Sequence, residues 1–207
     1  MGGTTQTDGR RERSRRTAAK IVTAARRRFV ENGYVETTVE SIAEAACVSP
    51  QTVYYVFGTK PRLLDAALDA TIAGDDQPVA LIKRGWVDAV ETATDAEGAV
   101  RAIAALAVAV LARVEPMLEV ARRAASVPEV AAIYDETRRR RRLDQRQLVE
   151  LLAGHGHLRD GLAVDDAADV VYALMSEELM VSLVTECGWS VERFGDWFAD
   201  TLVAQLV

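Results

Sequence analysis

Several polar side chains in the first third of the chain have the chemistry to bond to base edges and phosphates. Gln51, Thr52 and Tyr55 fall on the free face of a short predicted helix, with Tyr54 at the edge of that face. Glutamine can form two hydrogen bonds to adenine, while threonine and tyrosine can bond to phosphates or touch a thymine methyl group. Lys60 begins the next predicted helix, where a cation at a positively polarised helix end favours a phosphate. These residues predict contact with a DNA major groove.

Two short helices joined by a tight turn are expected to hold that face outward. Ser49 and Pro50 suit the cap and the first position of the reading helix. The spacing Thr37-x-x-Glu40 predicts a capping box at the start of the preceding helix. A longer basic helix comes before both and is expected to end at Gly33. The three elements predict a helix-turn-helix whose core is formed by Ala18, Ile21, Val22, Ala25, Phe29, Ile42, Ala43, Ala46, Val48 and Val53.

Charge is divided unevenly along the 207 residues, whose net charge is −6. Residues 1–62 hold 11 Lys and Arg against 6 Asp and Glu, whereas residues 63–207 hold 14 against 25. A basic N-terminal part and an acidic remainder predict that only the N-terminal part meets a polyanion. We expect no membrane span, because the sequence has no uncharged apolar run of about 18 residues. The polar, Arg-rich start lacks a secretory signal, so a cytoplasmic protein is expected.

The whole sequence predicts helices separated by Pro, Gly or capping residues, with no alternating strand pattern. We therefore expect an all-α fold of about nine helices. Residues 1–12 lack apolar periodicity and are expected to form a disordered basic arm. The predicted helix-turn-helix domain spans 13–58, a linker helix spans 59–73, and a helical domain spans 74–207. Helices in that last domain are expected near 79–94, 96–114, 117–126, 128–154, 165–187 and 190–206.

The residues around the turn resemble the signature of the TetR/AcrR repressor family. The matching positions are Phe29-x3-Gly33-Tyr34-x2-Thr37-Thr38-Val39-x2-Ile42-Ala43-x2-Ala46 and Val48-Ser49-x2-Thr52-Val53-Tyr54-x2-Phe57-x2-Lys60-x2-Leu63. One departure is Cys47, which replaces the usual glycine of the turn. The resemblance implies a dimer that binds a palindromic operator, and a C-terminal helical domain that binds a ligand and dimerises. The residues expected to contact DNA are Arg13, Arg15, Arg16, Thr38, Ser49, Gln51, Thr52, Tyr54, Tyr55 and Lys60.

The middle helices are expected to enclose a pocket for a largely apolar small molecule, with methionine and aromatic side chains as adaptable walls. Arg141 and Glu178 interrupt apolar stripes, and a buried charge should be paired. Our hypothesis is that one of them faces the pocket, where it pairs with the other or binds a charged group of a ligand; the alternative is that both reach solvent. The expected ligand-binding residues are Trp86, Leu106, Val110, Met117, Tyr134, Arg141, Tyr172, Met175 and Glu178.

The last two predicted helices carry strong apolar stripes. The resemblance implies that they meet the same helices of a second copy in a four-helix bundle, although the stripes could also face their own core. A dimer would place two reading helices about 34–36 Å apart, in successive major grooves, and a ligand that favours another spacing would weaken DNA binding. The residues expected at the dimer interface are Val181, Val184, Phe194, Trp197 and Phe198.

The sequence also bears on two other functions, a ligand-independent regulator and an enzyme. A DNA-binding regulator could be independent of ligands, with a C-terminal domain that only dimerises or binds a protein partner. An enzyme is disfavoured because the sequence has no nucleophile–base signature and no phosphate loop. No cofactor or metal is expected either, since His155 and His157 fall in a glycine-rich loop without further ligands and are interpreted as an exposed turn. The choice between repressor and activator stays open.

Overall fold

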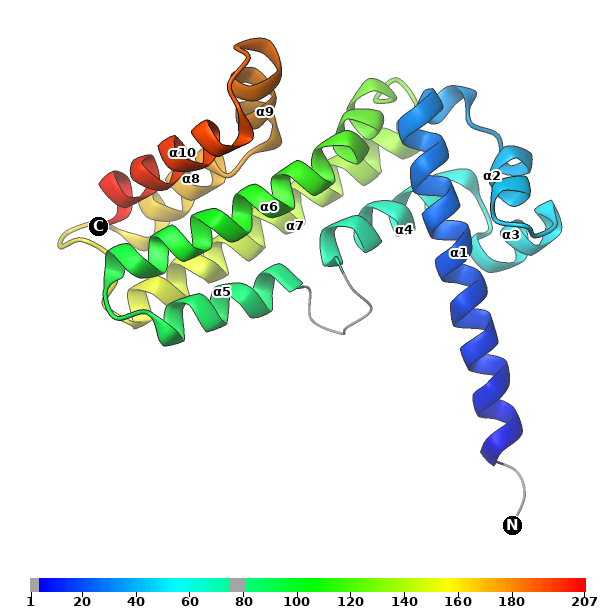
Figure 1. The fold of residues 1–207 in the computed structure, drawn as a ribbon, viewed down its shortest axis with the longest axis horizontal. Helices are drawn as coiled ribbons and strands as arrows, with labels where there is room; N and C mark the ends of the chain where they lie inside the picture. The colour runs from blue at the N-terminus through cyan, green and yellow to red at the C-terminus, as the bar shows by residue number, and fades with distance from the viewer. Residues whose placement is uncertain (1–3, 75–80) are drawn as a thin grey trace. The chain divides into compact units, whose positions relative to one another are not determined.

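The computed structural model describes residues 4–74 and 81–207, and every regular element among them is helical. The prediction of an all-α fold is confirmed, with ten α-helices and one π-helical segment in the described part (Figure 1). The chain divides into two compact units. The head comprises Met1–Thr71 and Met117–Tyr134, and the body comprises Ile72–Pro116 and Asp135–Val207. Residues 117–134 therefore group with the head, whereas we expected the whole of 74–207 to form one domain.

The first helix of the head, α1 (Thr4–Glu36), is longer than predicted. The expected disordered arm is helical from Thr4 onward, and residues 1–3 lie outside the described part. Two interactions one turn apart favour the helix here: Arg13 Nε donates to the Gly9 carbonyl at 3.1 Å, and Arg16 Nε bonds to Glu12 Oε1 at 3.0 Å. Such i,i+4 contacts stabilise an exposed helix.

The helix-turn-helix follows as α2 (Val39–Ala45) and α3 (Pro50–Phe57), after which α4 (Lys60–Ala73) begins. The head core contains the predicted apolar stripe, because Ile21, Ala25, Phe29, Ile42, Ala43, Ala46 and Val53 are all buried. Ala18, Val22 and Val48 are half-buried. Leu63, Leu64, Ala67 and Leu68 of α4 are also buried. Packing of these apolar faces, more than local propensity, stabilises such short helices.

The body contains α5 (Leu81–Thr92), most of α6 (Ala96–Arg123) and of α7 (Pro128–Gly154), α8 (Val164–Leu174), α9 (Glu177–Met180), η1 (Val181–Glu186) and α10 (Val191–Leu206). Its buried core draws apolar side chains from α5, α6, α7, α8, α9 and α10. The expected break at Glu115-Pro116 is absent, since α6 continues through Pro116. Val114 and Met117 on either side of the proline are buried. Packing of such apolar side chains offsets the backbone hydrogen bond that a proline removes from a helix.

The predicted helix over 165–187 is interrupted. α8 ends at Leu174, and Met175 leaves helical geometry at φ −83°, ψ 52°. Ser176 then caps α9, with its hydroxyl accepting from the Leu179 amide at 3.2 Å. The apolar periodicity continues across the interruption, so the sequence pattern alone favoured one long helix. In the described residues, none of the helices is both long and apolar enough to cross a membrane.

Candidate functional site

Helix α3 exposes one polar face. Tyr55 is 88% exposed, Gln51 and Tyr54 are exposed, and Thr52 is half-buried. Val53 points into the head core and is buried. A fixed inner side and a solvated outer side are what a helix needs to enter a major groove. The structure therefore brings together, on one surface, four of the residues that we expect to contact DNA.

Ser49 has a local structural role at the start of α3. Its hydroxyl accepts a hydrogen bond from the Thr52 amide at 3.2 Å and lies 2.9 Å from the Thr52 hydroxyl. This is the N-cap interaction predicted from the Ser49-Pro50 pair, and it satisfies an amide that the helix leaves without a carbonyl partner. A contact between Ser49 and DNA stays a prediction.

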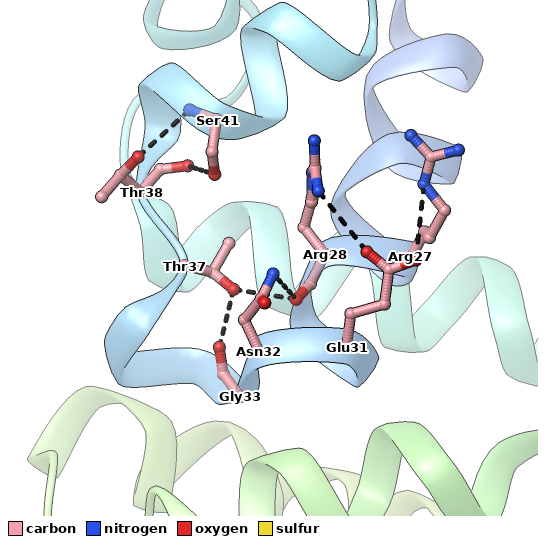
Figure 2. Close-up of polar contacts among 8 residues, drawn as sticks. All are labelled: Arg27, Arg28, Glu31, Asn32, Gly33, Thr37, Thr38 and Ser41. Carbon is pink, nitrogen blue, oxygen red and sulfur yellow. Dashed lines mark hydrogen bonds and ion pairs between the residues drawn. The ribbon is translucent and has the colours of Figure 1, made fainter.

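The start of α2 corrects the predicted capping box. Thr38, not Thr37, is the cap, and its hydroxyl accepts from the Ser41 amide at 3.1 Å. Thr37 is buried, with its hydroxyl 2.7 Å from the Gly33 carbonyl and 2.9 Å from the Arg28 carbonyl (Figure 2). These contacts join α2 to the end of α1, where Gly33 has φ 78°. Adjacent threonines look alike in a sequence pattern, and only the direction of the chain at this joint separates their roles.

Lys60 also contacts this joint. Its Nζ donates to the Thr37 carbonyl at 2.8 Å and to the Val35 carbonyl at 3.3 Å, and it lies 4.3 Å from the centre of the Tyr34 ring. Burial lowers the pKa of Lys60, and Glu36 opposes that shift. The first residue of α4 thus holds the segment that leads into α2. The predicted phosphate contact of Lys60 remains a prediction, and the sequence pattern did not indicate this second role.

The turn of the helix-turn-helix is formed without glycine. Cys47 is exposed and adopts φ 54°, the left-handed region that favours glycine. Backbone hydrogen bonds from the Cys47 and Val48 amides to Glu44 and Ala43 hold the turn at 3.1 Å and 3.0 Å. The turn therefore has its usual tightness and carries the cost of a side chain in an unfavourable conformation.

The basic residues expected to contact DNA from α1 are exposed. Arg13, Arg15 and Arg16 lie on the part of α1 that precedes its buried stripe. Arg13 and Arg16 use their Nε atoms within the helix, on the Gly9 carbonyl and on Glu12. Exposed side chains of this length can rearrange toward a phosphate at little cost, so the structure is compatible with the predicted contact.

The body encloses an ion pair between Arg141 of α7 and Glu177 of α9. The two side chains are 18% and 6% exposed, and Arg141 Nη1 bonds to Glu177 Oε2. Glu178, which our hypothesis placed opposite Arg141 or in solvent, has a side chain that is 45% exposed. It lies 4.0 Å from Arg141 and 3.9 Å from Arg138. Arg141 is therefore paired inside the body mainly with Glu177, the neighbour of Glu178, and its place in a ligand pocket stays a prediction.

Gln145 is a buried polar residue that the sequence analysis missed. It lies one turn after Arg141 on α7, and its Nε2 donates to the Met175 carbonyl at 3.1 Å, in the interruption between α8 and α9. The signal in the sequence was its register, four residues after Arg141 and three before the buried Leu148.

The other predicted ligand-binding residues are divided between the two units. Trp86 and Met175 are buried in the body core, while Leu106, Val110 and Tyr172 are half-buried there. The Tyr172 ring centre lies 4.8 Å from the Arg141 guanidinium carbon. Met117 and Tyr134 are buried and belong to the head.

The predicted dimer residues separate into two groups. Phe194 and Phe198 are fully buried within this chain and stack 5.6 Å apart, and their contact with a second copy stays a prediction. Val181, Val184 and Trp197 are half-buried and leave apolar surface accessible. Trp189, to which the sequence pattern assigned no role, meets Trp197 edge-on at 5.9 Å, and its ring lies 4.0 Å from the guanidinium carbon of Arg193.

Comparison with known proteins places these features in context. Residues 21–67 match the family described as bacterial regulatory proteins, tetR family. The HTH-type transcriptional regulator TtgR of Pseudomonas putida is 38% identical over 60 residues, which is 29% of each chain. The probable regulator ArpR, also of Pseudomonas putida, matches to the same extent. The alignment therefore spans less than a third of these curated relatives.

Solved structures resemble nearly the whole chain in fold. A Mesorhizobium loti protein assigned to the TetR family has a TM-score of 0.71 at 22% identity, covering 93% of this chain and 97% of that one. FadR from Bacillus subtilis, in complex with stearoyl-CoA, has a TM-score of 0.69 at 18% identity, covering 91% and 99%. The SmeT–triclosan complex has a TM-score of 0.69 at 20% identity, covering 91% and 90%.

Proposed function

We propose that this chain, whose residues 21–67 match the tetR family of bacterial regulatory proteins, is a TetR/AcrR-type cytoplasmic repressor that binds a palindromic operator as a homodimer and is released by a small, largely apolar effector. The observation that carries this proposal is the polar face of α3, with Gln51, Tyr54 and Tyr55 exposed over a buried inner side. The excess of basic residues in 1–62 and of acidic residues in the rest supports an encounter with DNA through the head alone.

A second copy is proposed because one short helix reads too few base pairs for useful specificity. The surface that would hold the two copies together lies on η1, on α10 and on the turn between them, where Val181, Val184, Trp189 and Trp197 are half-buried. Tryptophan is enriched where interfaces concentrate their binding energy. Two heads about 34–36 Å apart would then enter successive major grooves.

An effector is proposed because the FadR and SmeT structures were solved with stearoyl-CoA and triclosan, and because the body of this chain has a helical core with polar groups inside it. A small molecule that binds one arrangement of the two heads better than another changes the operator affinity by that difference in binding free energy. A repressor that responds in this way needs no chemistry on its ligand.

The test begins with selection of duplexes bound by the purified protein from a random pool. We expect enrichment of a palindrome, binding of two protomers for each duplex, and an affinity that falls steeply with salt. The selected site is then used in fluorescence anisotropy, with light scattering to determine the mass of the free protein. No enriched sequence, or a monomer that binds a half-site alone, would refute the proposal. Release by no compound of a broad screen would leave the ligand-independent regulator as the better description.

A further inference from the structure

The interruption between α8 and α9 leaves a short stretch of non-helical backbone inside the body. α8 ends at Leu174 and α9 begins at Glu177, so the intervening Met175 and Ser176 lie outside both helices. All three residues from Met175 to Glu177 are nevertheless buried. Buried carbonyl groups in such a segment need hydrogen-bond donors from elsewhere in the fold. Helix α7 supplies one such donor, to the Met175 carbonyl, from the side chain of Gln145.

Two residues of α7 reach this segment. Gln145 Nε2 donates to the Met175 carbonyl at 3.1 Å, and Arg141 Nη1 forms the ion pair with Glu177. Because the two residues are four apart on one helix, their side chains share a face and their Cβ atoms lie about 5–6 Å apart. Arg141 and Gln145 therefore form one site, which we call the α7 polar pair.

Each member of the α7 polar pair also has one buried atom without a partner in the described structure. Gln145 is 2% exposed, and its Oε1 accepts no hydrogen bond. The Nε–H of Arg141 is likewise buried and donates to nothing. One atom is an acceptor and the other a donor. Buried polar atoms in native proteins nearly always have partners, so this complementary pair points to a group that binds between them.

The charges around the pair restrict the kind of group. The positive charge of Arg141 is already matched by the buried carboxylate of Glu177, and the Tyr172 ring covers the guanidinium at 4.8 Å. An anionic group would have to displace Glu177, while a cationic group would meet the guanidinium. Either would be a buried charge without a partner, which is unfavourable. An uncharged group that both donates and accepts satisfies both atoms.

A third unpaired donor lies on the neighbouring helix. Trp86 is buried in the body core, and its indole N–H has no partner in the described structure. It is one turn beyond Lys83 on α5, whose Nζ bonds to Asp144 Oδ1 at 2.6 Å, next to Gln145 on α7. The buried apolar core to which Trp86 belongs also includes Leu148, Val171, Met175 and Met180. This combination suits a molecule with one polar end and an apolar remainder.

We propose that the α7 polar pair binds the polar end of the effector, and that this end is an uncharged carboxamide or hydroxyl group on an apolar skeleton. The identification of this molecule as the effector rests on the proposed function, whereas its binding to the body does not. Gln145 accepts from the N–H or O–H of the group, and Arg141 Nε donates to its oxygen. This replaces the sequence-based hypothesis of a charged ligand group at Arg141.

Four probes with one alkyl chain test the chemistry: octanamide, octan-1-ol, octanoate and octylamine, each added at pH 7.5 to the full-length protein without DNA. Binding is measured by calorimetry and by the rise in unfolding temperature. Octanamide and octan-1-ol are expected to bind at least about tenfold more tightly than the two charged probes. A tenfold difference corresponds to about one good hydrogen bond, which the uncharged probes form without burying a charge. Preference for octanoate or octylamine, or binding of none of the four, would overturn the proposal, since the unpaired atoms would then be satisfied by water alone.

Two variants and a control locate the site. Gln145→Leu removes the acceptor, and Arg141→Lys removes the Nε–H while leaving a cation for Glu177. Each is expected to weaken octanamide binding about tenfold or more. Gln147→Leu makes the same replacement at an exposed position of α7 and is expected to change nothing. If circular dichroism shows that Gln145→Leu does not fold, the test rests on Arg141→Lys. An unchanged octanamide affinity in a folded Arg141→Lys protein would refute the assignment of the site.

Operator release is measured separately with the selected duplex. Octanamide that binds the wild-type body and leaves operator affinity unchanged would refute the proposed regulatory role and keep the ligand site. If none of the four probes binds and a compound of another chemical class releases the operator, the proposed ligand site is refuted and the proposed regulatory function is kept. The two failures are therefore distinguishable.

Discussion

Helix α3 of the head and the α7 polar pair of the body carry their polar groups in opposite ways. Tyr55 of α3 is 88% exposed, whereas Gln145 of α7 is 2% exposed and bonds to a neighbouring segment. A side chain at the surface can be changed with little effect on folding, while one inside contributes to both folding and binding. Surface recognition and internal recognition should therefore respond differently to substitution.

The largest expected effect belongs to the interior. Glu177→Ala leaves the guanidinium of Arg141 without its buried partner, and breaking a buried pair in this way costs about 3–5 kcal/mol. Because Arg141 is 18% exposed and Glu178 is 4.0 Å away, we expect a smaller loss of about 2–3 kcal/mol in the free energy of unfolding. Chemical denaturation measures it. Glu178→Ala, at the exposed neighbour, should cost less than about 0.5 kcal/mol; equal losses for the two variants would contradict the burial of Glu177.

The next effect belongs to the surface. Tyr55→Ala should lower operator affinity by roughly tenfold or more, as expected for loss of a contact worth about 1–3 kcal/mol. The free energy of unfolding should stay within about 0.5 kcal/mol of wild type, because Tyr55 is exposed. Anisotropy and denaturation measure the two quantities. The matched variant Val53→Ala, at the buried side of the same helix, should instead lower stability; a Tyr55→Ala protein that is clearly destabilised would show that α3 does not present this face to solvent.

Lys60 combines an internal structural contact with a predicted contact to DNA at the surface. Lys60→Met removes the donors to the Val35 and Thr37 carbonyls, so the free energy of unfolding should fall by about 1 kcal/mol. The salt dependence of operator binding shows whether Lys60 also contacts a phosphate, because that contact contributes about 0.9 to the slope of log affinity against log salt. Arg62→Met, which removes an exposed cation from the same turn, is the control. Unchanged stability would mean that the carbonyl contacts contribute nothing.

The smallest effect is expected in the turn between α2 and α3. Cys47 has φ 54°, so Cys47→Gly relieves a conformation unfavourable for a residue with a Cβ, by about 0.5 kcal/mol after the entropy cost of glycine. Thermal unfolding should show a small rise in midpoint, with operator affinity unchanged. Cys187→Gly is the matched control, because Cys187 has φ −91° and should be slightly destabilised by glycine. A rise for both variants would point to the thiols and away from backbone conformation.

Much of the head could be predicted because its signals are local. Ser49-Pro50 starts α3 as expected, and the exposure of Gln51 and Tyr55 follows from their register with the buried Val53. The helix-turn-helix is compact enough that residues within one turn of each other decide which side is inside. Within the helix-turn-helix the error was a single-residue shift, Thr37 for Thr38, which depends on how the chain enters the helix.

The body was less predictable because its contacts join residues far apart in the sequence. Phe194 and Phe198 belong to a stripe that could have faced either a partner or the body core, and only the packed core decides between them. Arg141 and Glu177 are 36 residues apart, and Gln145 and Met175 are 30 apart. No local pattern indicates which of two adjacent glutamates turns inward at such a distance.

For this protein, amino-acid order alone determined an all-helical chain, a basic head and the outward face of α3, since helix periodicity and capping act over a few residues. Tertiary structure decided where α8 stops, which carboxylate meets Arg141, and which donor and acceptor stay unpaired beside it. Those outcomes depend on which buried groups meet across the core. An unpaired polar atom becomes unfavourable only when the packed helices remove it from water, so no short stretch of sequence determines its partner.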